Sequence, residues 1–126
     1  MIALQAQELE GLLQAYRHAT HAGSLEHPTH RYRAYNPACG DAITLELYLE
    51  PDDRVRAARY SGGICAVGTA SASTLCTLLE QHSGGWLRQL TDSEFLSMLP
   101  YRVPRQRTAC ATMPLHAAQK ALEHPL

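Results

Sequence analysis

The chain has 126 residues, a net charge of −1 and a pI near 6.6, with 45% hydrophobic and 18% charged residues. This length is sufficient for one hydrophobic core, so we expect a single domain over residues 1–126. The near-neutral charge argues against the strongly basic surface of nucleic-acid-binding proteins. No apolar stretch reaches the roughly 18 residues of a membrane span, and the first residues lack the basic start and apolar core of a signal peptide. We therefore expect a cytoplasmic protein with neither nucleic acid nor a membrane as partner.

The first third of the chain predicts one helix followed by a loop. Between residues 4 and 21, apolar residues recur at helical spacing (Leu4, Leu9, Leu12, Leu13 and Tyr16), which fits an amphipathic helix ended near Gly23. Residues 24–38 contain histidines and prolines without a clear period, so we expect a loop there.

A hairpin is predicted next. Apolar and polar residues alternate over residues 43–50, turn residues follow at 51–53, and a weaker alternation returns over residues 55–61. This pattern predicts two antiparallel strands joined by a short loop. Cys39 precedes the first strand and Cys65 follows the second, so strand pairing alone brings both thiols to the same end.

Three helices are predicted in the second half. Leucines at helical spacing follow Cys65, which places Cys65 near a helix N-terminus where the helix dipole favours a thiolate, and the glycines at 84 and 85 supply a stop. Residues 91–94 match a capping box for a short helix ended by Pro100. Because Pro114 belongs in a first turn, the last helix is expected to begin around Thr112, just after Cys110.

Three of the four cysteines lie in motifs suited to a metal or a cluster. In Asn36-Pro37-Ala38-Cys39-Gly40-Asp41, a thiol and a carboxylate stand two residues apart, so both leave an extended backbone on the same side. In a reducing cytosol, widely spaced cysteines indicate metal binding or catalysis before disulfides. Two alternatives remain, since free cysteines often act as small buried hydrophobes and some proteins close a structural zinc site with Cys and His ligands.

The other thiol and the histidines are weaker candidates. Cys76 would lie about 16 Å along the helix from Cys65, too far to share an ion, so a core position is expected. His116, His27 and His30 lie near proposed ligands in sequence but are more readily explained as solvated side chains. A hydrolase using Cys110 and His116 ranks last because no nucleophile motif surrounds them.

The Asn-Pro-Ala-Cys-Gly-Asp run, Cys65 before Ala70-Ser71-Ala72-Ser73, and Cys110-Ala111-Thr112-Met113 before a closing helix resemble the IscU/SufU/NifU-N family of iron–sulfur cluster assembly scaffolds, over nearly the whole chain. The resemblance implies an α+β fold in which an antiparallel sheet of about three strands packs against helices. It also implies a metal and cluster site formed by Cys39, Asp41, Cys65 and Cys110.

The function implied by the resemblance is that of a scaffold, not an enzyme. Such a scaffold receives sulfur from a cysteine desulfurase, assembles a labile [2Fe–2S] cluster and transfers it to acceptor proteins. The alternative is a SufU-type, zinc-dependent sulfurtransferase in which Cys39 accepts a persulfide sulfur. Arg107, three residues before Cys110, could offset the negative charge of the ligands in either case.

Some features depart from both branches of this family. The IscU branch has a histidine directly before the last cysteine, where this chain has Ala109, and the following Cys-Ala-Thr-Met is closer to the SufU branch. The insertion usual in the SufU branch does not fit between Cys65 and Cys110. The chaperone-binding Leu-Pro-Pro-Val-Lys of the IscU branch corresponds only to residues 103–107, Val-Pro-Arg-Gln-Arg.

Overall fold

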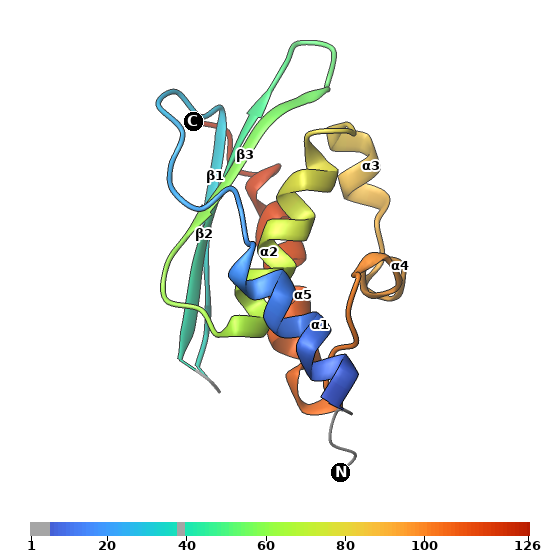
Figure 1. The fold of residues 1–126 in the computed structure, drawn as a ribbon. Coiled ribbons are helices and arrows are strands. Elements are labelled where there is room, and N and C mark those ends of the chain that lie inside the picture. The colour runs from blue at the N-terminus through green and yellow to red at the C-terminus, as the bar shows by residue number, and fades with distance from the viewer. Residues whose placement is uncertain (1–5, 38–39) are drawn as a thin grey trace.

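A computed structural model describes residues 6–37 and 40–126, and in it a three-stranded antiparallel sheet in the order β1-β2-β3 packs against helices on one side (Figure 1). This arrangement confirms the predicted α+β class. The elements in chain order are α1 (Ala6–Arg17), β1 (His30–Asn36), β2 (Asp41–Leu49), β3 (Val55–Ser61), α2 (Ala66–Leu79), α3 (Gly84–Gln89), α4 (Asp92–Met98), the 3₁₀ turn η1 (Arg105–Arg107) and α5 (Thr108–Ala121).

The core lies between the sheet and the helices α2 and α5. Central strand β2 directs three fully buried side chains, Ile43, Leu45 and Leu47, toward these helices, as the predicted alternation requires. Full burial of each such side chain stabilises the fold by roughly 1.5–3 kcal/mol. The central strand and its two covering helices therefore form a rigid support for the residues at their ends.

The hairpin, the capping box and the end of α4 before Pro100 are confirmed. Glu46 lies on the face of β2 that points away from the helices, where the alternation predicts exposed side chains. It is nevertheless only 5% exposed. Its carboxylate accepts hydrogen bonds from the Leu25 amide and the Arg31 side chain, both at 2.8 Å. The segment between α1 and β1 thus covers part of this face.

The loop predicted for residues 24–38 is wrong over its second half, which forms β1. This strand alternates exposed and half-buried residues but contains no leucine, isoleucine or valine, so it gave no apolar period. Its pairing with β2 stabilises it. The first helix also ends earlier than predicted, at Arg17, because the chain turns at His21 (φ 70°) and Gly23 donates a 2.8 Å hydrogen bond to the Tyr60 carbonyl.

Two helix boundaries in the second half are corrected as well. Gly84 and Gly85 begin α3 and do not end α2, because the Ser83 side chain caps the new helix. Helix α5 begins at Thr108 and continues through Pro114, so Cys110 lies in its first turn. Proline removes only one backbone donor, and the buried Ser71 hydroxyl donates to the neighbouring carbonyl of Ala111, which fixes this turn against α2.

Among the described residues, no helix combines the length and the apolar character needed to cross a membrane.

Candidate metal centre

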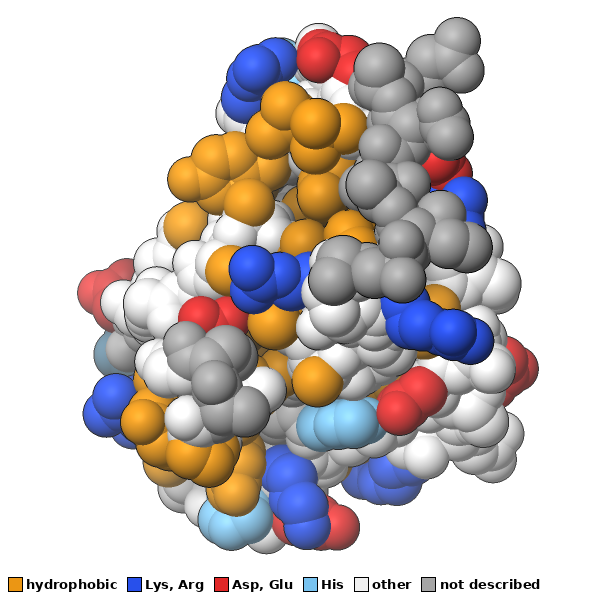
Figure 2. Space-filling model, turned by 90° about the horizontal axis from the view of Figure 1, so that it is seen from below, with side chains coloured by type: hydrophobic (Ala, Val, Ile, Leu, Met, Phe, Trp, Pro, Cys, Tyr) orange, Lys and Arg blue, Asp and Glu red, His pale blue; other side chains and the backbone are white. Residues whose placement is uncertain are grey.

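The candidate site lies at the end of the molecule where β1 joins β2. Figure 2 views this end and shows hydrophobic side chains gathered there, with Lys and Arg side chains between them. The first residue of β2, Asp41, faces this end and pairs with Asn36 on β1. Gly40 has φ 75°, a left-handed conformation suited to glycine, and donates a 2.8 Å hydrogen bond to the Asn36 carbonyl. This hydrogen bond and the pairing of Asp41 with Asn36 hold the start of β2 against the end of β1, and Asp41 is only 9% exposed.

Cys65 is the N-cap of α2, directly after the loop that leaves β3. This loop turns at Gly62, whose φ of 126° is strained for any residue with a β-carbon. A β-carbon at Gly62 would also lie 2.2 Å from the carbonyl oxygen of Ala42. Only glycine therefore lets the chain leave the sheet here and place Cys65 beside the start of β2.

Cys110 comes from a third element, the first turn of α5, and is 5% exposed. The helix approaches α2 closely at Gly68, where a β-carbon would lie 3.6 Å from the Cys110 carbonyl oxygen and 3.9 Å from Asp41 Oδ2. A side chain longer than alanine at this position would press against the Cys110 backbone and the Asp41 carboxylate. Gly68 therefore lies where α2, α5 and the start of β2 meet.

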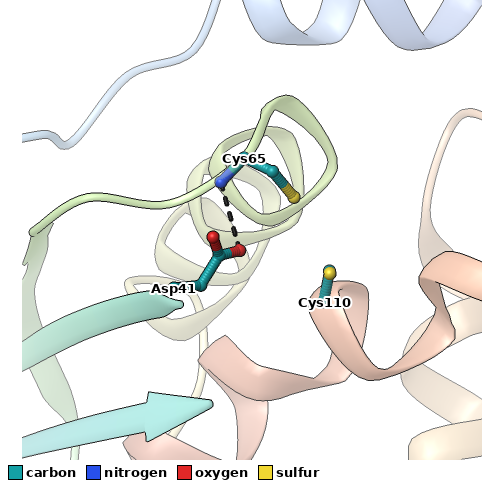
Figure 3. Close-up of side chains that lie close together, drawn as sticks. All are labelled: Asp41, Cys65 and Cys110. Carbon is teal, nitrogen blue, oxygen red and sulfur yellow. Dashed lines mark hydrogen bonds between the residues drawn. The ribbon is translucent and has the colours of Figure 1, made fainter. Parts of the chain in front are cut away.

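The structure places one ligand atom from each of Asp41, Cys65 and Cys110 within 4.8 Å of the others. Figure 3 shows the carboxylate and the two sulfurs converging from β2, the start of α2 and the start of α5. Asp41 Oδ2 also accepts a 3.2 Å hydrogen bond from the Cys65 backbone amide. The Cys65 sulfur accepts a 3.5 Å hydrogen bond from the Gly68 amide, in the first turn of α2.

The local electrostatics favour negatively charged ligands. The first turn of α2 carries the positive end of the helix dipole, which favours negative charge at this end of the helix. Arg107, exposed at the end of η1, lies beside the site: its hydrogen bond to Cys110, then the charges of Cys65 and Cys110, raise the pKa of its guanidinium. A permanent positive charge therefore stands next to the sulfurs and the carboxylate.

The donor set fits a thiophilic metal. Two sulfurs and one carboxylate oxygen are ligands that zinc and iron–sulfur chemistry use. Around one tetrahedral ion with metal–sulfur bonds of about 2.3 Å, ligand atoms lie roughly 3.8 Å apart. The group observed is slightly wider, so a shift of about 1 Å would close it on one ion.

The histidine candidates are not part of the group found among the described residues. Cys39 lies outside the described residues, so its place as a ligand stays a prediction. His116 on α5 forms a 2.7 Å contact with Asp92. His30 begins β1, at the end of the strand opposite to Asn36, and His27 is exposed in the preceding loop.

Cys76 is fully buried in the core, as expected for a packing residue. Burial, followed by the charge of Glu80, raises the pKa of its thiol, so Cys76 stays protonated and unreactive.

Sequence reasoning missed three residues that build the site. In the sequence, Gly62 stands just before a predicted helix and Gly68 stands within its first turn. Nothing in the sequence showed which carbonyl or carboxylate lies near them. Ser71 appeared only as one of a run of small residues, although its hydroxyl joins α2 to α5.

The family model of the NifU-like N terminal domain matches residues 7–124, and the chain belongs to this family. A search of curated proteins found no match. The match to the family model confirms the resemblance derived from the cysteine motifs.

Solved structures share the fold. The N-terminal part of a nitrogen-fixing NifU-like protein from Brucella abortus is similar with a TM-score of 0.74 and 18% identity, covering 90% of each chain. A protein from Fervidobacterium islandicum AW-1, assigned as an iron–sulfur cluster assembly scaffold for the SUF system, is similar with a TM-score of 0.73 and 16% identity, over 90% of this chain and 94% of that one. A hypothetical protein of known structure has a TM-score of 0.70 and 18% identity, over 96% of this chain and all of its own (100%).

Proposed function

We propose that this protein is an iron–sulfur cluster assembly scaffold. It receives sulfur from a cysteine desulfurase, assembles a labile [2Fe–2S] cluster as its cargo on Cys39, Asp41, Cys65 and Cys110, and passes the cluster to acceptor proteins. The observation that carries the proposal is the convergence of Asp41, Cys65 and Cys110 within 4.8 Å. Membership of the NifU-like N terminal domain family supports it. Cys39 is included because it stands two residues before Asp41 in the sequence.

The mixed donor set suits a cluster that must be given away. Thiolates bind iron in sulfide clusters firmly, whereas a carboxylate is a harder and less well matched ligand. Oδ2 of Asp41 also accepts a hydrogen bond from the Cys65 amide. This hydrogen bond makes the carboxylate a weaker electron donor to a metal. The bond to Asp41 is therefore the one expected to break first during transfer.

Arg107 has the role of balancing charge. Three thiolates and one carboxylate carry more negative charge than a divalent metal neutralises, and a guanidinium beside them offsets part of the excess. Its hydrogen bond to Cys110 also keeps that sulfur in place when no metal is bound. Arg107 therefore acts as a positioning residue and not as a ligand.

Anaerobic reconstitution with ferrous iron and sulfide tests the scaffold. The wild-type protein should develop the visible absorption of a [2Fe–2S] cluster and pass it to an apo-ferredoxin. Cys65→Ser should lose this absorption, because one thiolate ligand is removed. Cys76→Ala is the matched control and should keep it, because Cys76 is buried in the core. Equal cluster formation in wild type and Cys65→Ser would contradict the proposal.

A second candidate is a zinc-dependent sulfurtransferase. Two observations favour it: the three donor atoms lie within 4.8 Å of one another, close to the spacing around a single ion, and Ala109 precedes the last cysteine. In this role the Cys39 thiolate attacks the terminal sulfur of the desulfurase persulfide. The new sulfur–sulfur bond forms on Cys39, the old one breaks, and the desulfurase cysteine leaves as a thiolate.

Metal analysis and desulfurase assays separate the two functions. The sulfurtransferase predicts zinc close to one per chain, no cluster after reconstitution, and a strong rise in desulfurase turnover that Cys39→Ala abolishes. Mass spectrometry should then find one extra sulfur on Cys39. Cluster assembly without any effect on turnover would reject this second function.

A further inference from the structure

The outer edge of β1 is open beside the candidate metal centre. Strand β1 lies at the edge of the sheet. On its outer side, the Arg31 amide donates a 3.3 Å hydrogen bond to the His124 carbonyl, so Arg31 does not use this amide to pair with β2. Residues of an antiparallel strand alternate between the two sides, so the backbone groups of Arg33 and Tyr35 also face outward.

The pairing between β2 and β3 leads to the same conclusion about which backbone groups of β1 face outward. The Ala42 amide donates to the Gly63 carbonyl at 3.0 Å, so Ala42 directs its backbone away from β1 and toward the β3 side. Ala42 is the register partner of Tyr35, so the backbone groups of Tyr35 cannot pair with it. No residue in the described part of the chain forms a backbone hydrogen bond with the outer edge of Arg33 or Tyr35.

A groove of about 360 Å³ runs between this edge and α5. Its apolar lining comes from Ala34 on the β1 side and from Ala109, Met113 and Ala117 on the α5 side. Aromatic and polar residues complete the lining: Tyr32, Tyr35, Asn36, Pro37, Thr112, His116 and Lys120. Along β1 the half-buried residues, Ala34 among them, alternate with the exposed residues Arg33 and Tyr35, and Tyr35 also contributes to the lining of the groove.

The charges at the edge are positive. Arg33 is exposed and forms no ion pair among the described residues, whereas Arg31 is already paired with Glu46. Tyr35 is 64% exposed and adds a large apolar surface next to Arg33. An edge with free backbone groups, one unpaired arginine and an apolar groove favours an extended segment that is acidic on one face and apolar on the other.

We propose that residues 33–36 of β1 bind an extended segment of a partner protein, which adds a fourth strand to the sheet. Acidic side chains of the segment lie beside Arg33, and the intervening small apolar side chains enter the groove next to Ala34. Because β1 ends at Asn36, the partner of Asp41, the segment lies directly beside the candidate metal centre. The strand addition does not depend on the proposed function, since it uses only the edge and the groove.

A synthetic peptide tests the proposal. The probe is a capped, fluorescein-labelled octapeptide of alternating glutamate and valine, and its matched control has lysine in place of glutamate. Fluorescence anisotropy should show binding of the glutamate peptide and at least about fivefold weaker binding of the lysine peptide, given the usual size of a cross-strand charge pair. Hydrogen exchange should show new protection at the Arg33 and Tyr35 amides.

Backbone methylation distinguishes strand addition from simple charge attraction. In the proposed pairing, the glutamate amides face β1 and the valine amides face solvent. N-methylation of the glutamates should abolish binding, whereas N-methylation of the valines should leave most of it. Equal effects of the two modifications would overturn strand addition.

Charge reversal on the protein gives a second test. Arg33→Glu should weaken the glutamate peptide at least about fivefold and strengthen the lysine peptide. Arg54→Glu is the control, because it makes the same change of charge at an exposed position near the β2–β3 turn. Equal responses of the two variants would overturn the role of Arg33. Protection of Arg33 and Tyr35 that appears without peptide and rises with protein concentration would assign the edge to a second copy of the chain and overturn the proposal.

Discussion

Two aspartates at opposite ends of the sheet use the same local device with different consequences. Asp41, at the start of β2, accepts a 3.2 Å hydrogen bond from the Cys65 amide at the start of α2. Asp53, in the β2–β3 turn, accepts a 2.8 Å hydrogen bond from the Gly85 amide at the start of α3. In both places a carboxylate fixes a strand end to a helix N-terminus.

The N-cap residues make the difference between the two ends. Ser83 caps α3 with a hydroxyl that accepts a 3.1 Å hydrogen bond from Trp86. Cys65 caps α2 with a sulfur that accepts a 3.5 Å hydrogen bond from Gly68. Cys110 adds a second sulfur only at the Asp41 end, which turns a structural contact into a candidate metal centre.

The largest expected effect is on the free energy of unfolding, and it should differ between two adjacent glycines at the Asp41 end. Gly62→Ala should lower the free energy of unfolding by at least about 2 kcal/mol, because it adds a clash with the Ala42 carbonyl to a strained φ of 126°. Gly63→Ala should change it by less than about 0.5 kcal/mol, because nothing lies within 4 Å of its β-carbon. Urea unfolding measures both, and similar losses would remove the special role of Gly62.

The two aspartates themselves should differ in zinc binding. Asp41→Ala should weaken zinc affinity at least about tenfold, because an oxygen donor of the cluster of ligands is lost. Asp53→Ala should leave zinc affinity unchanged, since its carboxylate serves the Gly85 amide and a 3.7 Å contact with Arg88. Competition with a chromogenic chelator measures both affinities. An unchanged affinity for Asp41→Ala would exclude this carboxylate as a ligand.

The caps should differ in stability. Ser83→Ala should cost about 1 kcal/mol, because α3 loses its side-chain acceptor. Cys65→Ser in the metal-free protein should cost less, because serine is itself a preferred N-cap. Thermal unfolding in the presence of a chelator measures this contrast, and a larger loss for Cys65→Ser would show that its sulfur has a structural role beyond capping.

The smallest effect concerns pH at the Asp53 end. Burial lowers the pKa of His30, the charge of Arg88 lowers it further, and Asp53 opposes them. The unfolded chain therefore binds more protons than the folded protein just below pH 6.5, the ordinary value for histidine, so this end loses stability as the pH falls through that range. His30→Gln should reduce the change in the free energy of unfolding over this pH range by a few tenths of a kcal/mol, about the size expected for partly exposed charges. Urea unfolding between pH 5.5 and 7.5 checks this, and an unchanged slope would contradict it.

Much of the fold followed from local patterns. The alternation in β2 was clear because three fully buried side chains occupy every second position, and the capping box at Thr91 is a local arrangement of neighbouring residues. Strand β1 was missed because an edge strand with few aliphatic side chains gives no such signal. The start of α5 was misplaced because Pro114 normally marks a first turn, whereas packing against α2 stabilises the helix around it.

The sequence by itself determined the family, through the cysteine motifs, and it predicted which residues carry the chemistry. Strand pairing also predicted that the start of β2 and the residue after β3 would meet. Only the tertiary structure decided that Cys110, from the first turn of α5, lies within 4.8 Å of the other two described donors and that Arg107 stands beside it. It also decided which backbone groups of β1 remain open. The physical reason is that hydrogen-bond pairing and periodicity are local properties of a chain, whereas the approach of two helices depends on how all their buried side chains pack together.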